Sequence, residues 1–203
     1  MMFFVYALPA LIFMAFVVLY ASILRRPKPV SNGIRAVIPR VKNVHYEDLT
    51  AEFAELRWNW ELSGVVRYSA GKEDSRIRHE RLQWLIREVR AMKSNVRLYE
   101  AGGYWELAQI KDKKPENYND RDCVVCMILK TAPECLLALA TLEAQLVLVS
   151  ALSYTSMFAR PLDKRLIGAL EFASREYAEL TSLALTVAHS YGRVHYENLI
   201  CAL

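Results

Sequence analysis

The chain opens on an uninterrupted run of apolar residues. Residues 1–24 contain no charged residue, no histidine, no asparagine and no glutamine. As a helix rising about 1.5 Å per residue, this run is long enough to cross the ~30 Å hydrocarbon core of a bilayer. No charge precedes the run, and it is longer than the apolar region of a signal peptide. We therefore predict a transmembrane anchor at residues 1–24.

Basic residues follow the apolar run at once and indicate its orientation. Arg25, Arg26 and Lys28 lie on the C-terminal side only, so the positive-inside rule places the N-terminus outside and the rest of the chain in the cytoplasm. Residues 25–44 carry three prolines and further basic residues. This pattern predicts an extended linker over anionic lipid headgroups, with a short strand at residues 34–38.

The remaining residues, 45–203, show the apolar spacing of amphipathic helices. Apolar side chains recur every three or four positions, which is typical of helices that pack one face against a core. We predict a mainly α fold, with a single N-terminal transmembrane helix followed by a cytoplasmic helical bundle of about four helices. These helices are expected at residues 47–62, 79–96, 132–159 and 163–191.

Local signals predict where these helices begin and end. The pair Gly102-Gly103 is expected to interrupt the chain after the second helix. Thr131 is followed by a proline two residues on and a glutamate three residues on, which is typical of a helix start. Asp163 is the expected N-cap of the last helix, and Gly192 its expected C-terminal cap.

The helix predicted at residues 132–159 is apolar on every side, so it is either a core helix or a second membrane span. Glu143 lies near its middle, where an ionisable group is costly in lipid. A second span would also place Arg160 outside, against the positive-inside rule. We interpret this segment as the buried central helix, in which Glu143 needs a partner.

Basic residues are concentrated in the membrane-proximal half of a chain whose formal net charge is +4. The most basic stretch, residues 76–97, has two interpretations: a binding surface for nucleic acid or anionic lipid, or the solvated face of a core helix. Acidic residues interrupt the stretch and no aromatic platform accompanies it, so we favour the solvated face and disfavour nucleic acid. The residues concerned are Arg76, Arg78, Arg81, Arg87, Arg90, Lys93 and Arg97.

Three of the four cysteines lie close together in sequence. Cys123 and Cys126 have CxxC spacing, and Cys135 follows nine residues later. A zinc site or a redox site would use these thiols, but zinc wants four ligands and the intervening Val-Val pair is atypical of a redox motif. The alternative, which we favour, is that the cysteines are small apolar residues that line a core.

No phosphate-binding glycine loop, nucleophile elbow or dinucleotide fingerprint occurs in the sequence. We therefore expect a non-enzymatic accessory, scaffold or adaptor protein, or a subunit of a membrane complex. Trp58 and Trp84 point away from the main apolar stripes of their predicted helices. They are the expected contact surface for a protein partner or a second copy of the chain.

Overall fold

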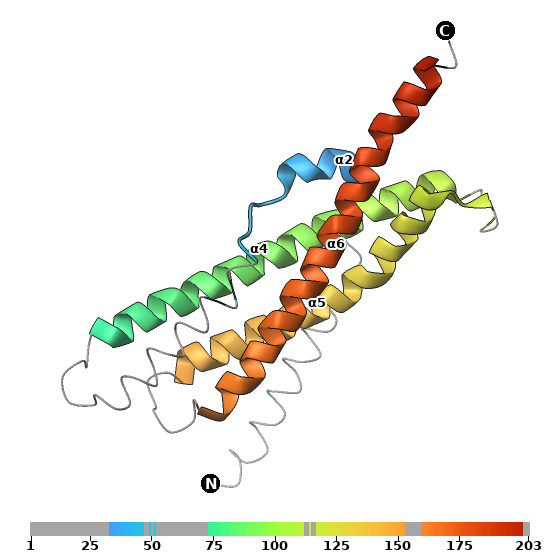
Figure 1. Cartoon of the computed structure of the whole chain (residues 1–203). Coiled ribbons are helices and arrows are strands. Elements are labelled where there is room, and N and C mark those ends of the chain that lie inside the picture. The colour runs from blue at the N-terminus through green and yellow to red at the C-terminus, as the bar shows by residue number, and fades with distance from the viewer. Residues whose placement is uncertain are drawn as a thin grey trace.

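The computed structural model describes residues 33–46, 49, 51, 73–111, 114, 117–152 and 160–200. All regular secondary structure in this part of the chain is helical, which confirms the predicted mainly α fold (Figure 1). The predicted anchor at 1–24, Trp58 and nearly all of the helix predicted at 47–62 lie outside the described residues. The elements are α2 (Ile34–Val37), the 3-10 helix η1 (Ile38–Arg40), α4 (Glu73–Ile110), α5 (Asp120–Leu152) and α6 (Arg160–Ile200).

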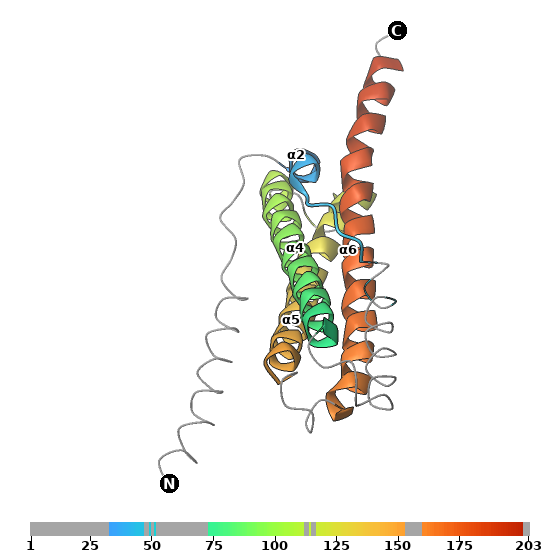
Figure 2. The same cartoon turned by 90° about the vertical axis from the view of Figure 1, so that its left-hand side faces the viewer.

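The three long helices form a bundle in which α5 packs on both α4 and α6, while α4 and α6 contact each other little. Helices α4 and α5 run antiparallel, and α6 returns alongside α5 (Figure 1). Helix α2 packs on α4 and on α6, at the side of the bundle away from most of α5 (Figure 2). Helix α5 is therefore the element that joins the two other long helices.

The core is built from apolar side chains that recur at helical spacing. On α4 the buried positions include Leu85, Val89 and Met92, and on α6 they include Leu170 and Leu180. Burying each side chain of this size stabilises the fold by about 1.5–3 kcal/mol. The apolar spacing that predicted these two helices therefore also identified their buried faces.

The expected interruption at Gly102-Gly103 is wrong, because α4 continues through both glycines. A Cβ atom at Gly102 would lie 3.0 Å from the Cα atom of Ile34. A Cβ atom at Gly103 would lie 3.0 Å from a methyl group of Leu129 in α5. The two glycines therefore let α2 and α5 approach the α4 backbone closely. The packing gained offsets the cost of about 1 kcal/mol that each glycine, compared with alanine, brings to a helix.

The short strand expected at residues 34–38 is also wrong, since this segment forms α2 and the start of η1. Ile34 and Val37 are both fully buried, three residues apart. A helical turn places side chains at this spacing on one face, whereas a strand would point them to opposite faces. Packing of both side chains against the bundle therefore selects the helix.

The predicted start of the third helix at Thr131 is wrong, because α5 begins at Asp120. The backbone N–H of Asp122 donates to the Asn119 side chain over 2.9 Å, and the Asn119 N–H donates back to the Asp122 carboxylate over 3.3 Å. This reciprocal pair caps the helix. Thr131 instead donates its hydroxyl to the Met127 carbonyl over 3.0 Å, and Pro133 lies inside the helix.

The limits of the last helix also differ from the prediction. Helix α6 begins at Arg160 and ends at Ile200, so Asp163 and Gly192 both lie inside it. A glycine costs a helix only about 1 kcal/mol, and the residues on either side of Gly192 continue the helix past it.

Replacing Gly102 by alanine tests the close contact between α2 and α4. We expect Gly102→Ala to lower the free energy of unfolding by roughly 1 kcal/mol, because a backbone atom of Ile34 must move. Gly168→Ala is the matched control, since nothing lies within 4 Å of a Cβ atom at that helical position. It should stabilise the protein by about 0.5–1 kcal/mol. Urea unfolding followed by circular dichroism measures both, and equal stabilisation by the two variants would contradict the proposed contact.

Candidate interaction surface

Glu143 holds α5 against α4. Its carboxylate accepts a hydrogen bond from Arg90 Nε and another from Lys93 Nζ, both over 2.6 Å. Burial alone would raise the pKa of Glu143, but these hydrogen bonds and the two positive charges bring the pKa below its ordinary value. The predicted partner of Glu143 is therefore found on α4, at a rim of the bundle where Arg90 is 59% exposed.

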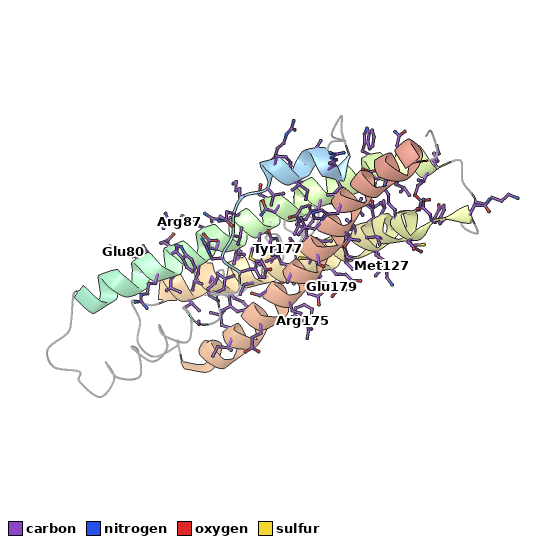
Figure 3. All side chains as sticks on the ribbon, turned by 45° about the horizontal axis from the view of Figure 1, so that its top comes forward. Glu80, Arg87, Met127, Arg175, Tyr177 and Glu179 are labelled. Atoms are coloured by element: carbon purple, nitrogen blue, oxygen red, sulfur yellow. The ribbon has the colours of Figure 1, made fainter. Side chains whose placement is uncertain are left out.

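Asn95 joins α4 to α6 and to the segment that follows η1. Its buried side-chain amide accepts from the backbone N–H of Lys42 and donates to the Lys42 carbonyl, each over 2.9 Å. The same amide nitrogen lies 2.7 Å from the hydroxyl of Tyr177, to which it donates. Tyr177 lies between α4 and α6 (Figure 3). The ring of Tyr46 packs edge-on against the Tyr177 ring, with the two ring centroids 5.5 Å apart. One side chain thus fixes three parts of the chain.

Glu106 joins α2, α4 and α5 near the turn between the two long helices. Its buried carboxylate accepts from the backbone N–H of Ile34 over 3.2 Å and pairs with Arg121 in the first turn of α5. A Cβ atom at Gly33 would collide with this carboxylate, so the glycine gives the chain room to enter the bundle here. The linker therefore reaches the bundle at the N-terminal end of α5.

The side of α5 opposite the core is exposed and apolar. Leu137, Val147 and Leu148 are 43%, 44% and 48% exposed. The helix predicted as the buried central helix does pack on both α4 and α6, but only one of its sides is buried. We define the α5 outer face as every exposed position between residues 137 and 148; none of them is charged, and they are Leu137, Thr141, Ala144, Val147 and Leu148.

Exposed apolar surface of this kind is typical of a contact with a protein or a membrane. Within the described part of the chain, α5 from Asp120 to Ser150 is the one helix that length and composition would allow to cross a bilayer. Core helices meet the same criterion, and the inner face of α5 belongs to the core of this bundle. The α5 outer face is therefore the strongest candidate for a functional surface.

The basic residues predicted as a patch do not form one exposed surface. Arg87 is exposed, but Arg90 and Lys93 bind Glu143. Arg97 lies 3.8 Å from the buried carboxylate of Glu100 and Arg81 is partly buried, while the side chains of Arg76 and Arg78 lie outside the described residues. The acidic residues of α4 and α5 thus neutralise part of this stretch.

Trp84 does not stand clear of the bundle. Its side chain is partly buried and packs against the apolar core. It therefore contributes to packing, and its predicted role in binding a partner stays a prediction.

The three cysteines lie along one helix and do not converge. Cys123 is exposed, Cys126 is partly buried and Cys135 is buried. Nine helical residues place Cys135 about 13 Å along α5 from Cys126 and on the opposite side. Thiolates that share one zinc ion lie within about 4 Å of each other. No three His, Cys, Asp or Glu side chains among the described residues are placed to hold a metal ion together.

An open groove of about 530 Å³ runs between Tyr46 and the outer side of α6. Three of its polar side chains bind the helix that carries them. The Thr186 hydroxyl donates to the Ser182 carbonyl over 2.9 Å, and the Ser190 hydroxyl donates to the Val187 carbonyl over 2.7 Å. His189 Nδ1 lies 2.8 Å from the Leu185 carbonyl oxygen. These groups are directed along α6, and the groove therefore does not present a converging set of polar groups.

Comparison with protein-family profiles, with curated proteins and with solved structures finds no match to this chain.

The ion pair of Glu143 predicts a pH-dependent stability. Because the folded state lowers the pKa of Glu143, the carboxylate stabilises the fold above its ordinary pKa of 4.5. This contribution is lost as the pH falls through the lower folded value. We expect Glu143→Gln to lower the free energy of unfolding by about 1 kcal/mol at pH 7, a small value because Arg90 is exposed and solvent screens the ion pair. In acid the variant should be as stable as the wild type. Glu134→Gln, on the exposed side of α5, is the control, and a pH-independent cost for Glu143→Gln would contradict the prediction.

The burial of Cys135 predicts unequal thiol reactivity. Burial, assisted by the charge of Glu176, raises the pKa of Cys135 to about 12. Since the thiolate is the reactive form, we expect iodoacetamide at pH 8 to modify Cys123 first, Cys126 more slowly and Cys135 only after unfolding. Peptide mass spectrometry on a Cys201→Ser background measures the three rates. Equal labelling of Cys123 and Cys135 in the native protein would rule out the buried placement.

Proposed function

We propose that the chain is a membrane-anchored accessory or adaptor protein that presents the α5 outer face to a protein partner. The observation that carries this proposal is the uncharged, exposed apolar surface from Leu137 to Leu148. The outer sides of α4 and α6, by contrast, carry exposed charges such as Arg87, Arg175 and Glu179 (Figure 3). An apolar strip between charged borders has the composition of an interface core with a polar rim.

The proposed anchor is the apolar segment at residues 1–24, with Arg25 and Arg26 at the cytoplasmic side of the bilayer. Eight residues separate this segment from Gly33, which lies against Glu106 in the bundle. Such a linker reaches at most about 26–29 Å. The bundle is thereby held beside the membrane surface.

The polar contacts within the bundle support a binding role for α5. Glu143 and Glu106 fix α5 to α4, and Asn95 fixes α4 to α6. A surface on helices that are held in this way loses little conformational entropy when a partner binds. The α5 outer face is therefore a preformed surface, which suits it to binding a partner.

A double variant on the α5 outer face tests the proposed function. In membranes treated with an amine cross-linker, we expect the wild type to appear in a complex larger than the monomer. Leu137→Glu combined with Leu148→Glu should yield the monomer, because burying two carboxylates at an interface is costly. Both positions are exposed, so the thermal unfolding of the bundle should change little.

Phe172→Glu is the matched control, because Phe172 is 47% exposed but lies on α6. This variant should keep the complex. A complex of unchanged size in the double variant would remove the proposed function.

Deletion of residues 1–24 should in turn release the protein from the membrane fraction, and retention there would exclude the proposed anchor.

A further inference from the structure

We infer that Glu100 is a proton-binding side chain at the contact between α4 and α5, where its neutral carboxyl group donates a hydrogen bond to the backbone carbonyl of Leu129. The inference concerns the inside of the bundle and does not depend on what the α5 outer face binds. It rests on the burial of Glu100, on the stretch of α5 that faces it, and on a proline inside that stretch.

Glu100 has too few partners for an ionised side chain. The residue is 4% exposed, and its Oε2 atom is buried without a hydrogen bond. Arg97, three residues earlier on α4, places its Nη1 atom 3.8 Å from Oε2, which is too far for a hydrogen bond. A buried carboxyl group in these surroundings favours the protonated form. Burial accordingly raises the pKa of Glu100 above its ordinary value of 4.5, and the charge of Arg97 opposes this effect only in part.

Contacts on either side of Glu100 show which stretch of α5 faces it. Lys93, two turns earlier on the same side of α4, binds Glu143. Gly103, about one turn later, packs against Leu129, since a Cβ atom there would lie 3.0 Å from a methyl group of that leucine. The two helices run antiparallel, so the step of about 4.5 Å from Gly103 back to Glu100 moves the facing position on α5 from 129 to about 132. Glu100 therefore faces the turn of α5 that follows Leu129.

A proline leaves one carbonyl of this turn without its usual donor. Pro133 lies inside α5 and has no backbone N–H, so the Leu129 carbonyl four residues earlier lacks the regular helical hydrogen bond. Helix carbonyls point toward the C-terminal end, which directs this one along α5 toward the level of Glu100. A neutral carboxyl group has an O–H donor, whereas a carboxylate has none. The proton of Glu100 thus joins two oxygens that would otherwise both be acceptors.

Few other ionisable groups of the described residues lie at this contact. On α4, Tyr104 follows Glu100 by about one turn. On the facing stretch of α5, Lys130 and Glu134 are both exposed, and Cys135 is buried and turned toward α6. Burial and the free carbonyl are therefore the main influences on the proton of Glu100.

The two carboxyl groups at the contact between α4 and α5 respond to pH in opposite directions. The folded state binds the Glu100 proton more tightly than the unfolded chain does, so this stabilisation is complete below pH 4.5 and is lost as the pH rises through the raised pKa. Glu143 stabilises the fold when it is ionised and loses this effect in acid. The contact is therefore strongest where Glu143 is ionised and Glu100 is neutral. Because α5 joins the other two long helices, this proton dependence extends to the whole bundle.

Carboxyl-carbon NMR of the full chain in detergent micelles measures the proton directly. In protein labelled at the glutamate side-chain carboxyl carbons, the signal that is missing from Glu100→Gln belongs to Glu100. We expect this signal to titrate above pH 4.5. Titration at or below that pH would overturn the inference and leave Glu100 as an ionised partner of Arg97.

Pro133→Ala tests the hydrogen-bond partner, because the alanine N–H supplies the Leu129 carbonyl with its regular helical donor. In this variant we expect the Glu100 titration to move down toward pH 4.5. Gly168→Ala, which also favours the helical backbone, is the matched control and should leave the titration in place. If Glu100 titrates high and Pro133→Ala does not lower its titration, the assignment of Leu129 is wrong.

Urea unfolding across the same pH range gives an independent readout. Glu100→Gln keeps the shape of the side chain and an N–H donor for Leu129, but it cannot become negatively charged. We expect the urea midpoint of the wild type to fall relative to that of Glu100→Gln as the pH rises from 4.5 to about 8. Glu134→Gln, which removes an exposed carboxylate from the facing stretch of α5, should not show this trend. A difference between Glu100→Gln and the wild type that stays constant with pH would overturn the inference.

Discussion

The packing of α5 on two long helices at once is the constraint on which the rest of the structure depends. Helices α4 and α6 contact each other little, so the core between them exists only while α5 is in place. One side of α5 is therefore committed to the fold, and Glu143 on its border is paired with α4. Entry of α5 into a bilayer would require α4 and α6 to follow, and their exposed charges, such as Arg87 and Glu179, oppose that. The side that remains available is the α5 outer face.

The N-terminal part of the bundle is held by side chains rather than by regular secondary structure. No strand of the described part of the chain pairs with the segment after η1, and the Asn95 amide takes the place of one for the Lys42 backbone. Glu106 likewise accepts a hydrogen bond from the backbone N–H of Ile34, the first residue of α2. The N–H of Ile34 is buried, and leaving it without a partner would cost about 1–3 kcal/mol. The Lys42 contacts are partly buried, and together these two polar residues hold the path of the chain. They also hold the linker at the end of the bundle where α5 begins.

The apolar spacing of the sequence predicted the helical class and the buried faces of α4 and α6, because periodicity reports directly on which side faces a core. Local sequence signals predicted the boundaries of the helices less well. The glycine pair at 102 and 103 was overridden by packing against α2 and α5. The expected cap at Thr131 lies inside α5, because Asn119 and Asp122 cap that helix at its start. The contacts of Asn95 with Lys42 and of Glu106 with Ile34 join residues more than fifty positions apart in sequence, which no local pattern reveals. The α5 outer face was missed because a helix that is apolar on every side gives no sign of which side is covered, although its spacing was present in the sequence.

The α5 outer face is small for a binding surface, and this bears on how it can work. Leu137 and Leu148, fully buried at an interface, would contribute about 1.5–3 kcal/mol each, which is modest against the entropic cost of bringing two free proteins together. The proposed anchor changes this comparison. Molecules confined to one bilayer, and held within a short linker of it, have already lost much of the freedom that association removes. A rigid strip of few apolar residues is then enough for specific contact, whereas the same strip on a freely diffusing bundle would bind weakly. The proposed anchor and the α5 outer face would thus have complementary roles, in which one supplies proximity and the other supplies specificity.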